Sequence, residues 1–277
     1  MFHQDLLPIV RPQPADVAGL VYAGGIDADG MILGGKVRSP ASGETYEVRD
    51  GYLDLLKGRL GADNVANLTN FLPGAGRGYE PLWRVHSLGL LAGEPFSNER
   101  ELRITSKLMD LRRGGRYLDL GCSAGLYARS LTRELGKLGN KGEVVGIDIS
   151  PSMLREAARR ARETGVSFAR ADAEALPFAD SSFSGAVCGG TLNELGDPAC
   201  ALREVHRVLQ PGARLAIMGI LRARTSRGRR LQRFLSIGGV RFFEPEELRS
   251  MLDHAGFDPD VLRTYGAIFF AGATRRD

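Results

Sequence analysis

The sequence is poor in cysteine. Its three cysteines, Cys122, Cys188 and Cys200, are an odd number, and no two stand at the spacing of a metal-ligand pair. This excludes a disulfide framework and a zinc site built on a CxxC pair. So few and so widely spaced thiols are typical of a reducing compartment, and we expect a cytoplasmic location.

Long apolar runs and a secretory leader are also missing. Nowhere do about 18 apolar residues follow one another, as a membrane-spanning helix would require. The first residues, MFHQDLLPIVRP, lack the cationic start and apolar run of a signal peptide. We therefore expect neither a transmembrane segment nor export.

Acidic residues are absent from one basic segment. Between Arg222 and Arg241 seven arginines occur without a single Asp or Glu. The whole chain of 277 residues has 37 Lys and Arg against 33 Asp and Glu, a formal net charge of +4, so the remainder carries −3. The basic character therefore belongs to one segment, which argues against a nucleic-acid surface spread over the chain.

The pattern along the chain divides it into three parts. Residues 1–58 combine glycine, proline and short β-like runs and predict a small β-rich module. Residues 59–112 predict a helical linker, in which Ser97 begins a helix with Leu102, Ile104, Leu108 and Met109 on its apolar face. Residues 113–277 predict one larger domain, with an arginine-rich insertion at 221–243.

The larger domain alternates short apolar runs with amphipathic helices. The expected strands are 117–120, 143–147, 166–169, 183–188 and 215–220, and the expected helices are 124–135, one beginning at Ser150-Pro151, 198–209 and 245–255. Such alternation predicts an α/β, Rossmann-like, doubly wound and mostly parallel sheet with helices on both faces. Ligands of such folds bind at the carboxyl ends of the strands.

A glycine-containing turn follows the first of these strands. The run LDLGCSAGLYAR places Gly121 and Gly125 around a tight turn that leads into a helix, and Asp148 ends the next strand, 23 residues beyond Gly125. An acid at this place can accept the hydroxyls of a ribose. Ser123 stands where a dinucleotide fingerprint has its middle glycine, and no P-loop motif is present.

Further segments continue the pattern in a fixed order. They are FARADAEALPF, the strand SFSGAVCGGTLNEL and the helix–turn REVHRVLQPGARLAI. Together with the glycine turn they resemble the class I S-adenosylmethionine (SAM)-dependent methyltransferases, in particular the ubiquinone/menaquinone-methyltransferase-like group. The resemblance covers about Arg116–Ile220 and implies SAM as cofactor, S-adenosylhomocysteine (SAH) as product and no metal.

The resemblance also implies roles for individual residues. Asp119 would meet the methionine amino group, and the loop would lie against the methionine carboxylate and ribose. Asp148 would hold the ribose hydroxyls, with Ile149 and Met153 against the adenine. The adenine amino group and ring nitrogen would meet Asp172 and Ala173, and Gly189 would leave room near the sulfonium. The implied cofactor residues are Asp119, Gly121, Cys122, Ser123, Gly125, Asp148, Ile149, Met153, Asp172, Ala173 and Gly189.

Methyl transfer by SN2 displacement needs positioning and sometimes a base. Glu194 and Asn193 follow the fourth strand, where similar enzymes place substrate-facing residues; the alternative is a solvated or helix-capping role. His86 is a further candidate base, with a structural histidine as the alternative. The family's segment ahead of the first strand is often a lid, so 59–112 is a candidate helical lid with Tyr79 and Trp83 near the substrate.

The arginine-rich insertion lies on the expected substrate side. Arg229, Arg230 and Phe234 are candidate substrate residues there. Such a cluster would attract an anionic small substrate, an acyl carrier, RNA phosphate or a membrane surface, and a solvated basic linker is the alternative.

The first 58 residues carry a second, fainter resemblance. SPASGETY and the following VRDGYLDLL are similar to the N-terminal zinc ribbon of some bacterial methyltransferases, including rRNA guanine methyltransferases. Arg11, Pro14, Ser39 and Ser42 stand where that ribbon has its cysteines. Without thiolates the module cannot hold zinc in this way, and packing alone would have to hold it together.

Three functions follow from these patterns. The first is a SAM-dependent methyltransferase that acts on a small molecule, either anionic or lipophilic and quinone-like. The second is an rRNA or tRNA base methyltransferase, for which the charge of −3 outside the arginine segment is unfavourable. The third is a SAM-binding regulator without catalysis. The sequence leaves the acceptor atom and the oligomeric state open.

Overall fold

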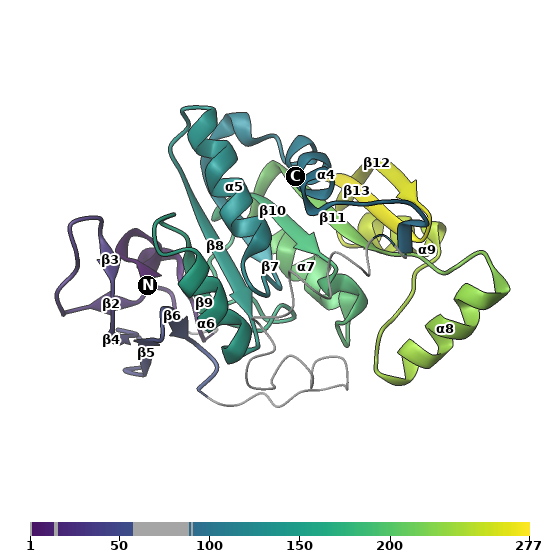
Figure 1. The fold of residues 1–277 in the computed structure, drawn as a ribbon. Coiled ribbons are helices and arrows are strands. Elements are labelled where there is room, and N and C mark those ends of the chain that lie inside the picture. The colour runs from purple at the N-terminus through teal and green to yellow at the C-terminus, as the bar shows by residue number, and fades with distance from the viewer. Residues whose placement is uncertain (1, 14–15, 58–88, 90) are drawn as a thin grey trace.

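The fold is seen in a computed structural model, which describes residues 2–13, 16–57, 89 and 91–277. The side chains at positions 227, 231 and 234 lie outside this description. Within the described residues the chain forms one large sheet with helices on both of its faces, and a two-stranded sheet near the N-terminus (Figure 1).

The large sheet has eleven strands in the described part of the chain. From one edge to the other they are β12 (Phe257–Tyr265), β13 (Ile268–Arg275), β11 (Leu209–Ile220), β10 (Phe183–Gly189), β7 (Gly115–Leu120), β8 (Gly142–Asp148), β9 (Ser167–Arg170), β6 (Tyr52–Asp54), β5 (Thr45–Arg49), β4 (Gly35–Arg38) and β2 (Val21–Tyr22). The six strands from β11 to β6 run parallel to one another. The strands beyond them at both edges pair in the antiparallel sense. This confirms the expected Rossmann-like, mostly parallel sheet.

Helices cover the two faces of the sheet and bury one apolar cluster on each. One cluster contains side chains of α4 (Asn98–Leu108), α5 (Leu126–Lys137) and α6 (Pro151–Arg160). The other contains side chains of α7 (Pro198–Val208), α9 (Pro245–His254) and the 3-10 helix η1 (Gln4–Ile9). Strand residues alternate between the two clusters, as the pleat of a strand requires; Tyr117 belongs to the first and Leu118 to the second.

Local sequence explains where the helices begin. The Ser97 hydroxyl accepts the Arg100 N–H at 3.2 Å, and the Ser150 hydroxyl accepts the Met153 N–H at 3.3 Å ahead of Pro151. Both are N-caps, which satisfy N–H groups that have no partner within the helix. The helix starts predicted from Ser97 and from Ser150-Pro151 are therefore confirmed.

The N-terminal residues do not form a core of their own. β1 (Phe2–His3) pairs with β3 (Met31–Ile32), but β6 pairs in parallel with β9, so β2, β4, β5 and β6 extend the large sheet. Side chains such as Phe2 and Val48 belong to the same apolar cluster as Leu118 of β7. The large sheet and this cluster therefore include residues from both sides of the expected boundary at residue 58.

Helix α4 packs its predicted apolar residues against the core, with Leu108 and Met109 buried, and buries two polar residues beside them. Glu101, Thr105 and Leu108 are its buried residues, whereas Leu102 and Ile104 are only half-buried. The polar Glu101 is tolerated inside because the Tyr127 hydroxyl hydrogen-bonds to it. A hydrophobic pattern alone could not predict the burial of Glu101, because this residue is a carboxylic acid.

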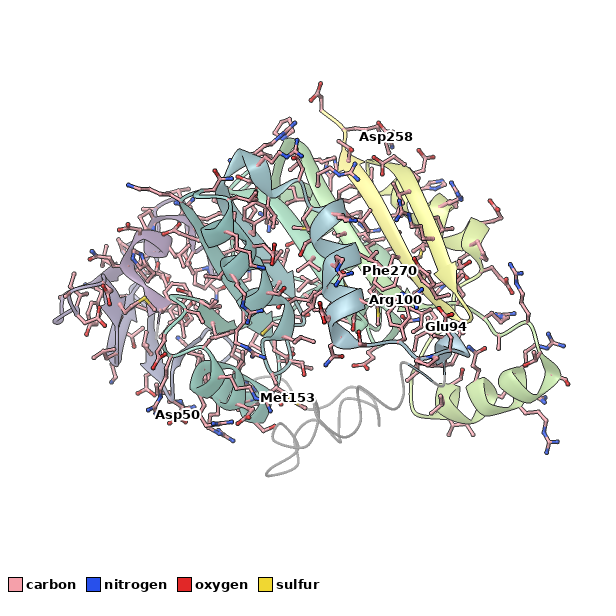
Figure 2. All side chains as sticks on the ribbon, turned by 45° about the horizontal axis from the view of Figure 1, so that its top comes forward. Asp50, Glu94, Arg100, Met153, Asp258 and Phe270 are labelled. Atoms are coloured by element: carbon pink, nitrogen blue, oxygen red, sulfur yellow. The ribbon has the colours of Figure 1, made fainter. Side chains whose placement is uncertain are left out.

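Phe96 and Arg100 hold the start of α4 against the β12–β13 hairpin. The Phe96 ring lies 5.9 Å from Phe270 and 5.3 Å from Tyr265, and the Arg100 guanidinium is 4.7 Å from the Tyr265 ring. Arg100 also forms an ion pair with Glu94 at 2.8 Å, and Figure 2 labels both. Phe96 is buried, so its aromatic ring packs into the core.

The C-terminal strands and two short helices complete the fold. η3 (Leu111–Arg113) precedes β7, η4 (Thr191–Asn193) follows β10, and α8 (Ser226–Ile237) lies at one end of the molecule (Figure 1). No helix among the described residues is long and apolar enough to cross a membrane.

Candidate functional site

The site lies where the direction of the strand order reverses. β7 has β8 on one side and β10 on the other, with Asp119 of β7 opposite both Gly146 and Val187. The connections from β7 and from β10 therefore leave the sheet side by side at its carboxyl edge. In a doubly wound sheet this arrangement opens a crevice for a ligand.

The glycine turn is built from backbone with positive φ. Gly121, Ser123 and Gly125 have φ values of 67°, 48° and 78°. The Gly125 N–H donates to the Cys122 carbonyl at 2.8 Å, and the Cys122 N–H donates to the Ile147 carbonyl of β8 at 2.7 Å. These bonds close the turn, fix it to the neighbouring strand and lead into α5, whose N-terminus carries the positive end of the helix dipole.

Two close approaches explain the glycines at the ends of β7 and β10. A Cβ on Gly121 would lie 2.1 Å from Thr191 Oγ1, and Thr191 donates to the Gly121 carbonyl at 3.1 Å. A Cβ on Gly189 would lie 2.0 Å from Tyr127 Cε2. The Tyr127 ring thus fills the space that a side chain at position 189 would need.

Asp148 joins the glycine turn to the start of α6. Its Oδ2 accepts the Ser123 N–H and its Oδ1 accepts the Ser150 N–H, each at 2.8 Å. Burial raises the pKa of this carboxyl, and the N–H groups of Ser150, Ser123 and Ile149 act in the opposite direction. A carboxylate has about four lone-pair sites, so it keeps capacity to accept a donor from a ligand, such as a hydroxyl.

Met153 lies directly against the turn. Its side chain is buried, and its Sδ is 3.5 Å from the Ser123 hydroxyl; Figure 2 labels it on α6. Ile149 is half-buried, and its carbonyl accepts the Arg170 Nε–H at 2.9 Å. The structure thus places Met153 against the glycine turn and Ile149 directly after Asp148.

Asp172 borders a cavity of about 180 Å³ between the core and the N-terminal residues. Its Oδ1 accepts the Glu174 N–H at 2.9 Å, and Ala173 is buried. Tyr46 and Lys57, from the N-terminal residues, line the same cavity. The N-terminal residues therefore contribute to the surroundings of Asp172, which sequence reasoning did not predict.

Asp119 and the two nearby thiols are buried beneath the turn. Asp119 Oδ2 accepts the Ala128 N–H of α5 at 2.9 Å, which holds that helix to the end of β7. Burial raises the pKa of Cys122 well above its ordinary value and that of Cys188 to about 12. Both thiols are therefore held in their neutral form near pH 7.

Asn193 supports the site rather than facing it. Its side-chain amide donates to the carbonyls of Ile220 and Arg241 at 2.8 and 2.7 Å, and its Oδ1 accepts the Ile220 N–H at 2.9 Å. The side chain is buried, and backbone groups use both of its donors. This corrects the expectation of Asn193 as a catalytic group, because no N–H of its amide is left for a substrate.

Glu194 remains the candidate base at this edge. It is half-buried and follows η4, where its N–H donates to the Thr191 carbonyl at 2.8 Å. Glu194 follows Thr191 by three residues, and the Thr191 hydroxyl binds the Gly121 carbonyl of the glycine turn. Tyr79, Trp83 and His86, together with most of the expected lid, lie outside the described residues.

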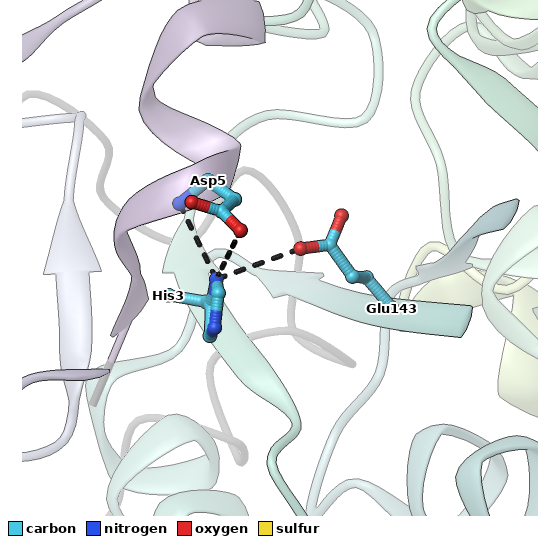
Figure 3. A group of neighbouring side chains, drawn as sticks. All are labelled: His3, Asp5 and Glu143. Carbon is cyan, nitrogen blue, oxygen red and sulfur yellow. Dashed lines mark hydrogen bonds and ion pairs between the residues drawn. The ribbon is translucent and has the colours of Figure 1, made fainter. Parts of the chain in front are cut away.

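The one group of His, Asp and Glu among the described residues with metal-ligand proximity lies elsewhere. His3 Nδ1 is 3.8 Å from Asp5 Oδ2 and 3.5 Å from Glu143 Oε1 (Figure 3). Nδ1 also accepts the Asp5 N–H at 3.3 Å, and Glu143 pairs with Arg116 at 2.7 Å. The contact between His3 and Glu143 joins β1 to β8.

Tyr127 and Glu101 are the residues near the site that sequence reasoning missed. The short hydrogen bond between them, together with the contact of Tyr127 with Gly189, links α4 to α5 and to the end of β10. The one signal in the sequence was spacing, because Glu101 precedes Thr105 by four residues and Leu108 by seven, as on one face of a helix. The structure buries all three.

Comparison with known proteins gives the same assignment. A family model described as "Methyltransferase domain" matches residues 118–217. The ubiquinone/menaquinone biosynthesis C-methyltransferase UbiE of Serratia proteamaculans is 33% identical over 180 residues, which are 61% of this chain and 70% of that protein. The chain belongs to the class I SAM-dependent methyltransferases.

Two further proteins are similar to parts of the chain. The 2-phytyl-1,4-naphtoquinone methyltransferase of Synechococcus elongatus is 38% identical over 124 residues, 43% of this chain. The chain thus spans about half the length of that relative, 52%. A solved Haemonchus contortus phosphoethanolamine N-methyltransferase, in complex with SAH, covers 73% of this chain and 59% of its own, with a TM-score of 0.58 and 17% identity. This likeness concerns the methyltransferase fold.

The described residues fit the SAM cofactor of this family. The turn with positive φ brings backbone, rather than side chains, to the crevice, and Asp148 retains acceptor sites beside it. The buried apolar Met153 lies next to both. Such groups would suit the three parts of SAM, which are the ribose, the adenine ring and the methionine portion.

Proposed function

We propose that this protein transfers a methyl group from SAM to a small-molecule acceptor that is lipophilic or quinone-like. The observation that carries the proposal is the carboxylate of Asp148, fixed by two N–H groups next to the positive-φ turn. The names of the relatives, which refer to quinones, support an acceptor of this class. A cytoplasmic location, the absence of a metal and the roles of the individual site residues are part of the same proposal.

The chain's own residues would position the reactants. Asp148 orients the ribose hydroxyls, and Ile149 and Met153 contact the adenine, with Asp172 and Ala173 at its polar edge. Asp119 fixes the start of α5 and thereby the turn. The bound cofactor supplies an electrophilic methyl group, so positioning and exclusion of water account for most of what the protein must add.

Glu194 would accept the proton that the acceptor loses. It lies at the carboxyl edge of β10 and is half-buried. A carboxylate within hydrogen-bond reach of an acidic hydroxyl or carbon can act as a general base. When bound, SAM would supply the methyl group to the nucleophilic atom of the acceptor, and Glu194 would take up the proton that this atom releases.

Methyl transfer is tested with tritiated SAM and 2-phytyl-1,4-naphtoquinone, used oxidised and chemically reduced. We expect tritium in the organic phase with the reduced form, because its ring is richer in electrons. Glu194→Gln should lower kcat about a hundredfold while SAH affinity is unchanged. Glu246→Gln, at an exposed position on α9, is the matched control.

If no label enters either form of the quinone, a size-fractionated cell extract replaces it. Label that appears only in the RNA fraction would contradict a small-molecule acceptor and favour the base methyltransferase. SAH binding without label in any fraction would favour the regulator.

A further inference from the structure

A large groove lies between α8 and the segment that leads into α9. Its volume is about 920 Å³. Its charged lining consists of Glu247 and five arginines, namely Arg222, Arg229, Arg230, Arg233 and Arg241. The groove is separate from the glycine turn and is concave, which suits a discrete ligand better than a flat surface does.

The charges in the groove are not balanced. Arg241 forms an ion pair with Glu247 at 2.6 Å, and Arg222 pairs with Glu244 at 3.4 Å. Among the described residues, the other three lining arginines have no acidic partner. Arg229 donates to the Arg224 carbonyl at 2.7 Å, and Arg230 and Arg233 are exposed. An unbalanced cluster of guanidinium groups in a groove attracts a multiply charged anion.

The helix that carries these arginines is anchored to the core. Gln232 is buried, and its amide donates to the Leu221 carbonyl at 2.8 Å and accepts the Ala223 N–H at 2.7 Å. With 3.6 residues per turn, Arg229, Arg233 and Arg230 lie about 60°, 100° and 160° around the helix from Gln232, all to the same side of the anchored face. This bonding fixes one wall of the groove relative to the end of β11.

The opposite wall is connected to the candidate active site. The Arg241 N–H donates to the Asn193 carbonyl at 2.7 Å, and the Asn193 amide donates to the Arg241 carbonyl at 2.7 Å. Asn193 belongs to η4, whose Thr191 contacts Gly121. The groove therefore begins at the same carboxyl edge of the sheet that the proposed acceptor would occupy.

We propose that this groove binds a phosphate or diphosphate group. As a statement about the acceptor, this rests on the proposed function, and it means that the methylated molecule carries such a group at its far end. Guanidinium forms two parallel hydrogen bonds to phosphate oxygens, and three arginines without acidic partners match an anion of charge −2 or −3. The group can belong to a soluble ester or to a phospholipid.

The test is calorimetric titration of the full chain with inorganic pyrophosphate. We expect binding by the wild type that weakens at least tenfold in Arg230→Gln/Arg233→Gln and is lost in Arg230→Glu/Arg233→Glu. Arg133→Glu/Arg249→Glu, at two exposed arginines outside the groove, should bind as the wild type does. SAH affinity should be equal in the wild type and the three double variants. A loss of pyrophosphate binding with unchanged SAH binding can therefore be distinguished from failure of the proposed function.

Two further arms identify the source of the phosphate. Flotation with phosphatidylglycerol vesicles, compared with phosphatidylcholine vesicles, tests a lipid headgroup, and titration with glycerol 3-phosphate tests a soluble ester. Binding in either arm that depends on Arg230 and Arg233 supports the proposal. No binding of any of these probes, or binding that the glutamine pair leaves unchanged, would overturn it. Arginine-dependent retention of an oligoribonucleotide that pyrophosphate fails to displace would also overturn it.

Discussion

Ser123 occupies a backbone conformation that glycine adopts more easily than any other residue. Its φ of 48° lies in the left-handed region, and its N–H is used by Asp148 at 2.8 Å. The conformation is needed because Gly125, two residues later, must close the turn onto Cys122. Glycine would adopt this conformation without strain, and serine is tolerated because it is small and not branched at Cβ.

Substitution at Ser123 should follow this backbone requirement. In Ser123→Gly, relief of strain and the greater entropy of the unfolded chain nearly cancel, so the free energy of unfolding should stay within about 0.5 kcal/mol of the wild type. In Ser123→Val, a branched side chain with positive φ should lower the free energy of unfolding by about 2 kcal/mol and weaken SAH binding. Urea unfolding and calorimetry measure both, and equal stability of the two variants would contradict the assigned conformation.

At the scale of single elements, α6 depends on one buried carboxylate. Glu156 is 5% exposed and accepts hydrogen bonds from Arg159 Nε at 2.9 Å and from Arg160 Nε at 2.6 Å. These bonds lower the pKa of Glu156 to about 2, against burial, which acts in the opposite direction. The ionised carboxylate thus stabilises the helix on the face that packs against β8 and β9.

The pH dependence of this contribution has a definite sign. A folded-state pKa below the ordinary value of 4.5 gives stability that is complete above pH 4.5 and disappears as the pH falls toward 2. Glu156→Gln should lower the unfolding free energy by about 1–2 kcal/mol at pH 7, because half-exposed arginines weaken the full effect. The difference from the wild type should shrink between pH 4.5 and 2, measured by urea unfolding. Exposed Glu163→Gln should show no such trend.

A hydrogen-bonded cluster occurs where the zinc-ribbon resemblance would place metal ligands. Asp16 and Ser39 are both buried and are joined by a short hydrogen bond between their side chains. Asp16 Oδ2 also accepts the Gln13 N–H at 3.0 Å, and Ser39 Oγ accepts the Ser42 N–H at 3.1 Å. This pair connects the two turns through side chains and backbone of the chain itself.

Removal of this connection should destabilise the N-terminal part without any involvement of metal. Ser39→Ala leaves the buried Asp16 carboxylate with one hydrogen bond fewer and should lower the unfolding free energy by about 2 kcal/mol. Ser42→Ala, at an exposed position, should change it by less than about 0.5 kcal/mol. Dialysis against EDTA should leave the Tm of the wild type unchanged, and a lower Tm after dialysis would show that a metal holds these turns.

Elements with strong local signals could be predicted, and those decided by tertiary pairing could not. Ser150-Pro151 marks the start of α6 in any context. By contrast, Pro211 and Gly212 suggested a turn before a strand at 215, yet β11 begins at Leu209, because a register shift opposite Phe183 and Gly185 accommodates them. β12 and β13 were not predicted, since their long antiparallel pairing is with each other and with β11.

At the scale of the whole molecule, one sheet carries both the site and its surroundings. The glycine turn, Asp148 and Asp172 follow successive parallel strands, so their common edge could be predicted from the order of strands and motifs. The contributions of Tyr127, Glu101 and the N-terminal residues could not be, because α4 and β6 meet the core through contacts distant in sequence. The arginine groove likewise requires α8 and the segment before α9 to be adjacent.

Binding of SAH, measured by isothermal titration calorimetry, tests the central claim most directly. We expect one site per chain in the wild type and at least tenfold weaker binding in Asp148→Ala, since the carboxylate proposed to accept the ribose hydroxyls is lost. Asp29→Ala, at an exposed acid distant in sequence from Asp148, should bind SAH as the wild type does. Melting curves verify that each variant is folded. Absence of binding to the folded wild type, or equal affinity in Asp148→Ala, would contradict the account.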